Sequence, residues 1–186
     1  MMDTVIASLD LQQKGIWLPL LVGAILLLFV FFMPKRQMNW QSIYLTAGVV
    51  TAVGLLLDIN IIGQYLDLFD LGDPNKEGIG DLISYSIIPS CLAVIYLNYL
   101  DQQRKGVYIV IFIALSFLYE WELTQLGYMK LKGWQNWYSI FVYLVVYGLW
   151  LPWHLNIMRE LSRSMEQNVQ SKSYRVYPVG GVLNLP

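Results

Sequence analysis

The sequence predicts an all-α integral membrane protein, a bundle of five transmembrane helices with the N-terminus outside and the C-terminus in the cytoplasm. Three observations lead to this prediction. Hydrophobic residues make up 56% of the chain and charged residues only 13%, against roughly 25% charged residues in ordinary soluble domains. Apolar segments recur along the chain at bilayer-spanning length, too many for a soluble fold to bury. Lys and Arg concentrate in alternate connections between these segments.

The first two segments are predicted at residues 16–33 and 39–62, since a helix needs about 20 apolar residues to cross a hydrocarbon core of about 30 Å. The first has no charged residue and ends before Pro34, which a helix interior tolerates badly. The second begins at Asn39-Trp40 and carries Asp58 near its far end. A polar connection with the turn-forming sequence Gly72-Asp73-Pro74-Asn75 follows it.

The remaining three helices are predicted at residues 82–100, 107–128 and 136–157. The third helix contains Pro89 in its middle, and short polar connections separate it from the fourth and the fourth from the fifth. We therefore assign residues 1–158 to a transmembrane domain. Residues 159–186 form a cytoplasmic tail, which has no helical period from Tyr174 onward.

Positive charge sets the expected orientation, because cytoplasmic connections of membrane proteins are enriched in Lys and Arg. With the N-terminus outside, the outer connections hold Lys14, Lys76, Lys130 and Lys132. The inner ones hold twice as many basic residues, namely Lys35, Arg36, Arg104, Lys105, Arg159, Arg163, Lys172 and Arg175. The acidic stretch between Asp67 and Asp81 is then expected to face outward.

Composition also excludes several function classes. The net charge of −1 gives no electrostatic basis for binding nucleic acid. A single cysteine, Cys91, and a single histidine, His154, leave no disulfide framework and no Cys- or His-rich metal cage. We therefore expect no metal, no cofactor and no nucleic-acid partner. Membrane lipid is the expected partner, together with other membrane proteins or a second copy of the chain.

Carboxyl groups inside predicted spans are the strongest functional signal, because each costs roughly 2.5–3.5 kcal/mol to insert. Asp58, Glu120 and Glu122 all fall in the outer half of their helices at about 1.5 Å of rise per residue. Hydroxyl groups of the third and fifth helices reach similar depth. The candidate intramembrane polar patch therefore comprises Glu120, Asp58, Glu122, Tyr85, Ser86, Ser139 and Tyr143.

Glu120 and Glu122 point in nearly opposite directions, since two residues span about 200° of a helix. We favour Glu120 as the buried one, on the same face as Ser116. It is expected to be protonated and to donate to an acceptor such as Tyr143 or Ser139. The alternatives are that Glu120 only joins helices together and that Asp58 and Glu122 reach the outer headgroups.

Two further residue groups are given structural roles. His154 is predicted about 12 Å inside the midplane, far from the carboxyl groups, so we interpret it as interfacial and not as a metal ligand. Ser90 and Cys91 lie beside Pro89, which frees a backbone carbonyl. A serine beside such a kink commonly satisfies that carbonyl, so no nucleophile is inferred.

Three segments carry a resemblance to a known family: Tyr85-Ser-Ile-Ile-Pro-Ser90, Leu118-Tyr-Glu-Trp121 and Gly133-Trp-Gln-Asn-Trp-Tyr-Ser139. In their combination the chain resembles an uncharacterised family of small multi-pass membrane proteins from spore-forming Firmicutes. The resemblance covers about the central and C-terminal two-thirds of the chain. It implies a multi-pass protein of the bacterial cytoplasmic membrane, and it implies no activity.

Three function hypotheses follow. The sequence favours a structural or binding subunit of the bacterial membrane without enzymatic activity, because it contains no catalytic constellation. The alternative is a small carrier or channel that uses the outward-facing polar patch around Glu120. A weaker alternative is a membrane enzyme that acts on lipid, with paired carboxyl groups as acid and base.

Overall fold

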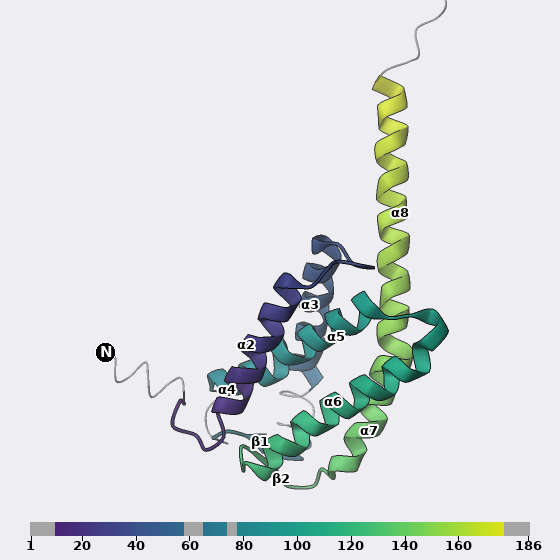
Figure 1. Cartoon of the computed structure of the whole chain (residues 1–186). Helices are drawn as coiled ribbons and strands as arrows, with labels where there is room; N and C mark the ends of the chain where they lie inside the picture. The colour runs from purple at the N-terminus through teal and green to yellow at the C-terminus, as the bar shows by residue number, and fades with distance from the viewer. Residues whose placement is uncertain (1–9, 58–64, 74–77, 177–186) are drawn as a thin grey trace, which may run out of the picture.

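The computed structural model describes residues 10–57, 65–73 and 78–176, and these residues are mostly helical (Figure 1). Among these residues, four helical stretches are long and apolar enough to cross a membrane, which indicates a membrane protein. The elements are α2 (Trp17–Phe32), α3 (Trp40–Gly54), β1 (Phe69–Leu71), α4 (Ile79–Leu82), η2 (Ile83–Ile87), α5 (Ile88–Tyr99), η3 (Gln102–Arg104), α6 (Lys105–Gln125), β2 (Met129–Leu131), α7 (Asn136–Val145), η4 (Val146–Trp150) and α8 (Leu151–Val176).

The helices run back and forth between two ends of the molecule. At one end, which we call the sheet end, β1 and β2 form an antiparallel pair in which Asp70 lies opposite Lys130. At the other end, which we call the tail end, Arg159 donates to Gln37 Oε1 over 2.6 Å, and the Gln37 amide donates to Leu100 O. Figure 1 shows α8 leaving the bundle at the tail end and continuing well beyond it.

Helix α5 forms the centre of the bundle. It packs against α2, α3, α6 and α8, and Tyr96, Leu97 and Leu100 are fully buried. The outer faces of the surrounding helices expose large apolar side chains instead, such as Phe32 on α2 and Val110 on α6. This inside-out distribution matches a bundle whose outer surface contacts lipid, because lipid does not penalise exposed apolar groups.

Asn98 organises the tail end. Its side chain is fully buried, and its Oδ1 accepts hydrogen bonds from the backbone N–H groups of Arg36 and Gln37 at 2.9 and 3.3 Å. Its Nδ2 donates to Pro34 O over 2.9 Å. One amide therefore satisfies three backbone groups in the connection between α2 and α3, which fixes that connection against α5.

Among the described elements, η2 and η4 are π-helical turns within long helices, and each ends two residues before a proline. The turn η2 precedes Pro89 and η4 precedes Pro152. Proline lacks an N–H and its ring clashes with the carbonyl four residues earlier, so a wider turn relieves the clash. At η2 the α3 backbone comes so close that a Cβ at Gly54 would overlap Tyr85 O, and glycine is therefore required there.

The structure differs from the predicted elements at four places. The helix of α4, η2 and α5 begins at Ile79 and not at 82, because Asp81 caps its first turn. The pair β1–β2 was not predicted, since each strand has only three residues. Helix α2 has 16 residues, or about 24 Å, which is short for a complete span. The last helix continues through the polar sequence to Val176 and does not end at 157.

Candidate functional site

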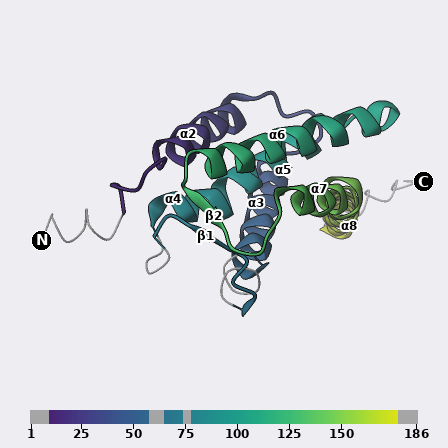
Figure 2. The ribbon, with the colours of Figure 1, turned by 90° about the horizontal axis from the view of Figure 1, so that it is seen from below.

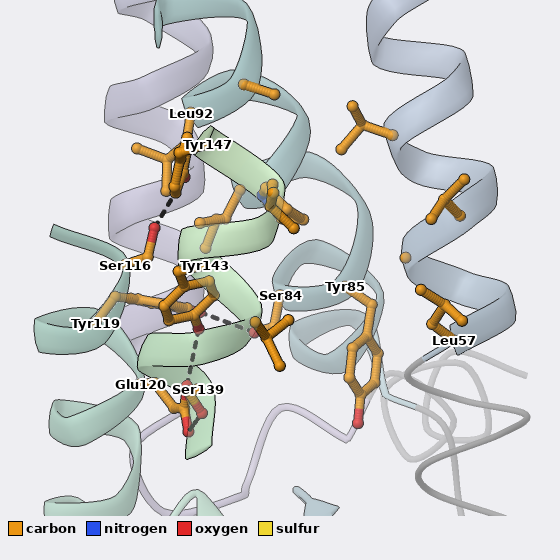
Figure 3. Close-up of a pocket in the computed structure, with 18 of the residues that line it drawn as sticks. Leu57, Ser84, Tyr85, Leu92, Ser116, Tyr119, Glu120, Ser139, Tyr143 and Tyr147 are labelled. Carbon is orange, nitrogen blue, oxygen red and sulfur yellow. Dashed lines mark hydrogen bonds between the residues drawn. The ribbon is translucent and has the colours of Figure 1, made fainter. Parts of the chain in front are cut away.

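A cavity of about 240 Å³ lies inside the bundle, in the half toward the sheet end. Figure 3 shows side chains from several helices converging on it. Most of the lining is apolar, and Phe69, Leu71 and Met129 of the two strands belong to it. Figure 2 shows the strands lying across the ends of the helices. The polar part of the lining consists of Ser84, Tyr85, Ser116, Tyr119, Glu120, Ser139, Tyr143 and Tyr147.

Glu120 lies in the cavity wall, and only 7% of it is exposed. Ser139 Oγ donates to its Oε1 over 2.6 Å, and Tyr143 OH donates to its Oε2 over 2.8 Å (Figure 3). Trp134 Nε1 donates in turn to Ser139 Oγ over 2.8 Å. An indole N–H can only donate, so the chain of hydrogen bonds runs from Trp134 through Ser139 toward the carboxyl group.

The local sequence explains this arrangement. Trp134 precedes the first turn of α7, and its backbone N–H donates to Leu68 O beside strand β1. The indole therefore lies over the start of α7 and reaches Ser139 five residues later. Ser139 and Tyr143 are four residues apart on α7, so both hydroxyl groups face α6 and meet the two oxygens of Glu120.

Two more hydroxyl pairs join helices around the cavity. Ser84 of η2 contacts Tyr119 OH at 2.8 Å, and Ser116 of α6 contacts Tyr147 OH at 2.9 Å (Figure 3). Ser116 and Glu120 lie on one face of α6, as their spacing predicted. Because η2 and η4 supply Ser84 and Tyr147, the proline-linked wide turns contribute directly to the cavity wall.

The structure brings together some of the predicted patch residues and separates others. Glu120, Ser139 and Tyr143 form one hydrogen-bonded group, and Tyr85 lines the same cavity. Glu122 is exposed, so its assignment to the patch is wrong. It lies two residues after Glu120, about half a helical turn, and therefore points to the opposite side of α6. Asp58 lies outside the described residues.

Ser86 does not join the patch either. Its hydroxyl donates to Leu82 O in its own helix, and its carbonyl accepts from Thr51 of α3. The wide turn η2 directs the neighbouring Ser84 toward α6 in its place. The partners expected for the Glu120 carboxyl group, Ser139 and Tyr143, are the ones that contact it.

His154 and Ser90 both contact α3. His154 is buried at 8% exposure, and its Nε2 lies 3.0 Å from Thr46 Oγ1 on α3, so it joins two helices. Ser90 donates to Ala47 O and contacts Thr51, both on α3, and not a carbonyl freed by Pro89. The close packing of α3 on α5 explains both contacts of Ser90.

A second buried carboxyl group, Asp81, was not predicted. It was placed in the outward-facing acidic stretch, but it is 2% exposed. Its Oδ2 accepts from Gly78 N and its Oδ1 from Tyr128 OH, both over 2.7 Å. Burial raises the pKa of the Tyr128 hydroxyl, and the neighbouring Asp81 carboxyl raises it further. An acidic residue three positions after a glycine N-cap was the signal available in the sequence.

Within the described part of the chain, no group of three or more His, Cys, Asp or Glu residues is placed to hold a metal ion. The site is therefore one carboxyl group, its hydroxyl donors and an apolar cavity. Comparisons of the chain with protein-family models, with curated proteins and with solved structures found no match.

Proposed function

We propose that this chain is a binding protein of the bacterial cytoplasmic membrane that holds a small molecule in the cavity beside Glu120. In this proposal the five helices α2, α3, α5, α6 and the continuous α7–α8 all cross the membrane. The sheet end faces outward and the tail end faces the cytoplasm. The observation that carries the proposal is a buried carboxyl group in the wall of a cavity.

A purely structural role explains this observation less well. Protein interiors are packed to crystal-like density, and cavities much larger than a water molecule are few. A cavity of about 240 Å³ exceeds the roughly 150 Å³ that suffices for benzene in an engineered apolar site. Ligand sites are mostly apolar with a few convergent polar groups, and this cavity has that composition.

The positions of Glu120 and Glu122 argue against a lipid enzyme that uses paired carboxyl groups. That hypothesis requires two carboxyl groups that act as acid and base on one substrate. Glu120 is buried and Glu122 is exposed, so these two residues do not form such a pair.

Native mass spectrometry of the full-length protein, purified in a mild detergent, tests the proposal. We expect the wild-type protein to retain a bound molecule of at most a few hundred daltons, because a cavity of this volume admits roughly that ligand size. Glu120→Leu and the cavity-filling Ala93→Leu should lose it, whereas Glu122→Gln should keep it. Equal adducts in all four proteins, or none in wild type, would contradict binding in this cavity.

Transport is a second candidate, because π-helical turns frequently mark functional sites and two of them line the cavity. The molecule identified above, loaded into proteoliposomes, distinguishes the two functions. A binding protein leaves the internal concentration unchanged, whereas a carrier releases the molecule at a rate that Glu120→Leu abolishes.

The orientation is tested by cysteine labelling in a Cys91→Ala background. Lys130→Cys at the sheet end and Gln103→Cys at the tail end are both at exposed positions. An impermeant thiol reagent on intact cells should label the first and spare the second. Labelling in the reverse pattern would invert the proposed topology.

A further inference from the structure

The partners of the Glu120 carboxyl group point to the kind of ligand. Both carboxyl oxygens accept a hydrogen bond, Oε1 from Ser139 and Oε2 from Tyr143. Both hydroxyl groups can donate to the carboxyl oxygens, so they stabilise the ionised form of Glu120 when a cation binds beside it. The chain from Trp134 through Ser139 adds donors that polarise one another toward the negative charge.

An ionised carboxylate in an apolar bundle needs a positive partner, because burying an unpaired charge is costly. The described residues that line the cavity include no Lys, Arg or His. The described spans carry Lys and Arg only near their tail-end termini, at Arg104, Lys105 and Arg159, and His154 lies in the same tail-end half. Among the described side chains that line the cavity, none therefore supplies a cation for an ionised Glu120.

Aromatic rings surround the same space. Tyr119, Tyr143 and Tyr147 line the cavity from α6, α7 and η4, and Trp134 and Trp150 line it as well. The faces of such rings attract cations, most strongly when water is excluded. A carboxylate and several aromatic rings around one apolar space are the chemistry that recognises an organic cation.

We propose that the cavity binds a small organic cation, a protonated amine with an apolar body of about the size of a benzene ring. The ammonium group contacts the carboxylate oxygens of Glu120, each of which keeps a second lone pair beyond the hydroxyl it already accepts. The apolar body occupies the space between η2, α5 and the two strands. This inference rests on the proposed binding function and names its ligand class.

Calorimetric titration of the full-length protein in phosphatidylcholine nanodiscs tests the inference, with empty nanodiscs as the blank. The probes are 2-phenylethylamine, which is cationic at pH 7, and propylbenzene, its neutral counterpart of nearly equal shape. We expect saturable binding of the amine at least about tenfold tighter than that of propylbenzene, as one favourable buried charge contact provides.

Two variants locate the cation. Glu120→Gln keeps the shape and hydrogen-bonding capacity of the side chain, and it should weaken amine binding about tenfold while leaving propylbenzene unchanged. Glu122→Gln removes an exposed carboxyl group two residues further along α6 and should change neither affinity. Because the two probes are compared on wild type, the test holds even if a variant folds poorly.

The outcomes separate the two proposals. Equal affinity for both probes, unaffected by Glu120→Gln, overturns the cation inference and leaves a cavity that binds neutral apolar molecules. Saturable binding of neither probe overturns the cation inference, and the native mass spectrometry above then decides whether the cavity binds a different molecule. Amine selectivity that depends on Glu120 and not on Glu122 supports both proposals.

Discussion

Two buried carboxyl groups in the sheet-end half of this bundle have opposite surroundings. Asp81 accepts from a backbone N–H and from Tyr128, and its neighbours fill the space around it. A Cβ at Gly80 would already overlap the Tyr128 hydroxyl. The Glu120 carboxyl group is contacted by the hydroxyl groups of Ser139 and Tyr143, and a cavity lies beside it.

The difference teaches how a membrane protein separates structure from binding. A backbone donor cannot move without unfolding its turn, so the contacts of Asp81 fix the start of α4 against the loop that holds Tyr128. Hydroxyl donors rotate at little cost and can adjust when a third partner reaches the carboxylate. We therefore expect substitutions at Asp81 to change stability most, and those at Glu120 to change binding most.

The largest effect is expected for Asp81→Ala. This substitution leaves the Gly78 N–H and the Tyr128 hydroxyl without their partner in a buried site, which costs about 3 kcal/mol of unfolding free energy for a charged acceptor with two donors. Denaturation of the purified protein in mixed detergent micelles measures the change. Glu122→Ala, at an exposed position, serves as control, and an equal loss in both variants would refute the role of Asp81.

Tyr128→Phe is expected to cost about 2 kcal/mol near neutral pH, since it removes one hydrogen bond to a charged group. The cost depends on pH. Burial and the Asp81 carboxyl raise the pKa of Tyr128, so its contribution is complete below the ordinary tyrosine pKa of about 10 and declines as pH rises above it. Unfolding of wild type and variant between pH 7 and 11 should show the difference shrinking, and a constant difference would contradict this assignment.

The sequence predicts much of this structure, and the misses have physical causes. Apolar length located the long apolar helices of the described residues but not the polar end of α8, because hydropathy responds only to segments that lipid can accommodate. Depth along the helices placed Glu120, Ser139 and Tyr143 at one level, and helical spacing separated Glu120 from Glu122. These inferences need only the regular geometry of a helix.

Rotation around the helix axis was harder to predict. The turns η2 and η4 shift the facing direction of every residue beyond them, so Ser84 and not Ser86 reaches the cavity. Pro89 and Pro152 mark these turns, but a proline does not specify whether the helix kinks or widens. Asp81 was missed because an acidic residue in a polar connection is usually solvated, and only long-range contact with Tyr128 buries it.

Glu120→Leu is expected to cost about 1–2 kcal/mol, because Ser139 and Tyr143 lose their acceptor. Glu120→Gln should leave stability nearly unchanged, since its carbonyl oxygen still accepts, while the binding of an organic cation weakens about tenfold. Detergent unfolding and calorimetric titration of both variants separate the two effects. A more stable Glu120→Leu variant would show that the side chain contacts lipid and would end the cavity proposal.

The smallest effect is expected at the ion pair that joins the strands. Lys132 Nζ lies 2.6 Å from Asp67 Oδ1 and 3.0 Å from Asp70 Oδ1, at the exposed surface of the sheet end. Hydrogen bonds to Asp67 and then Asp70 raise the pKa of Lys132, so the pair is complete below the ordinary lysine pKa and is lost only as pH rises past the raised value.

Exposed ion pairs contribute little and are screened by salt. Lys132→Ala should therefore lower the unfolding midpoint only slightly more than Lys130→Ala, its exposed neighbour on β2, and the difference should vanish at high salt. Detergent unfolding at low and high salt checks this. A large, salt-independent loss in Lys132→Ala would mean that this ion pair, and not the packing of Phe69, Leu71 and Met129, holds the strands over the cavity.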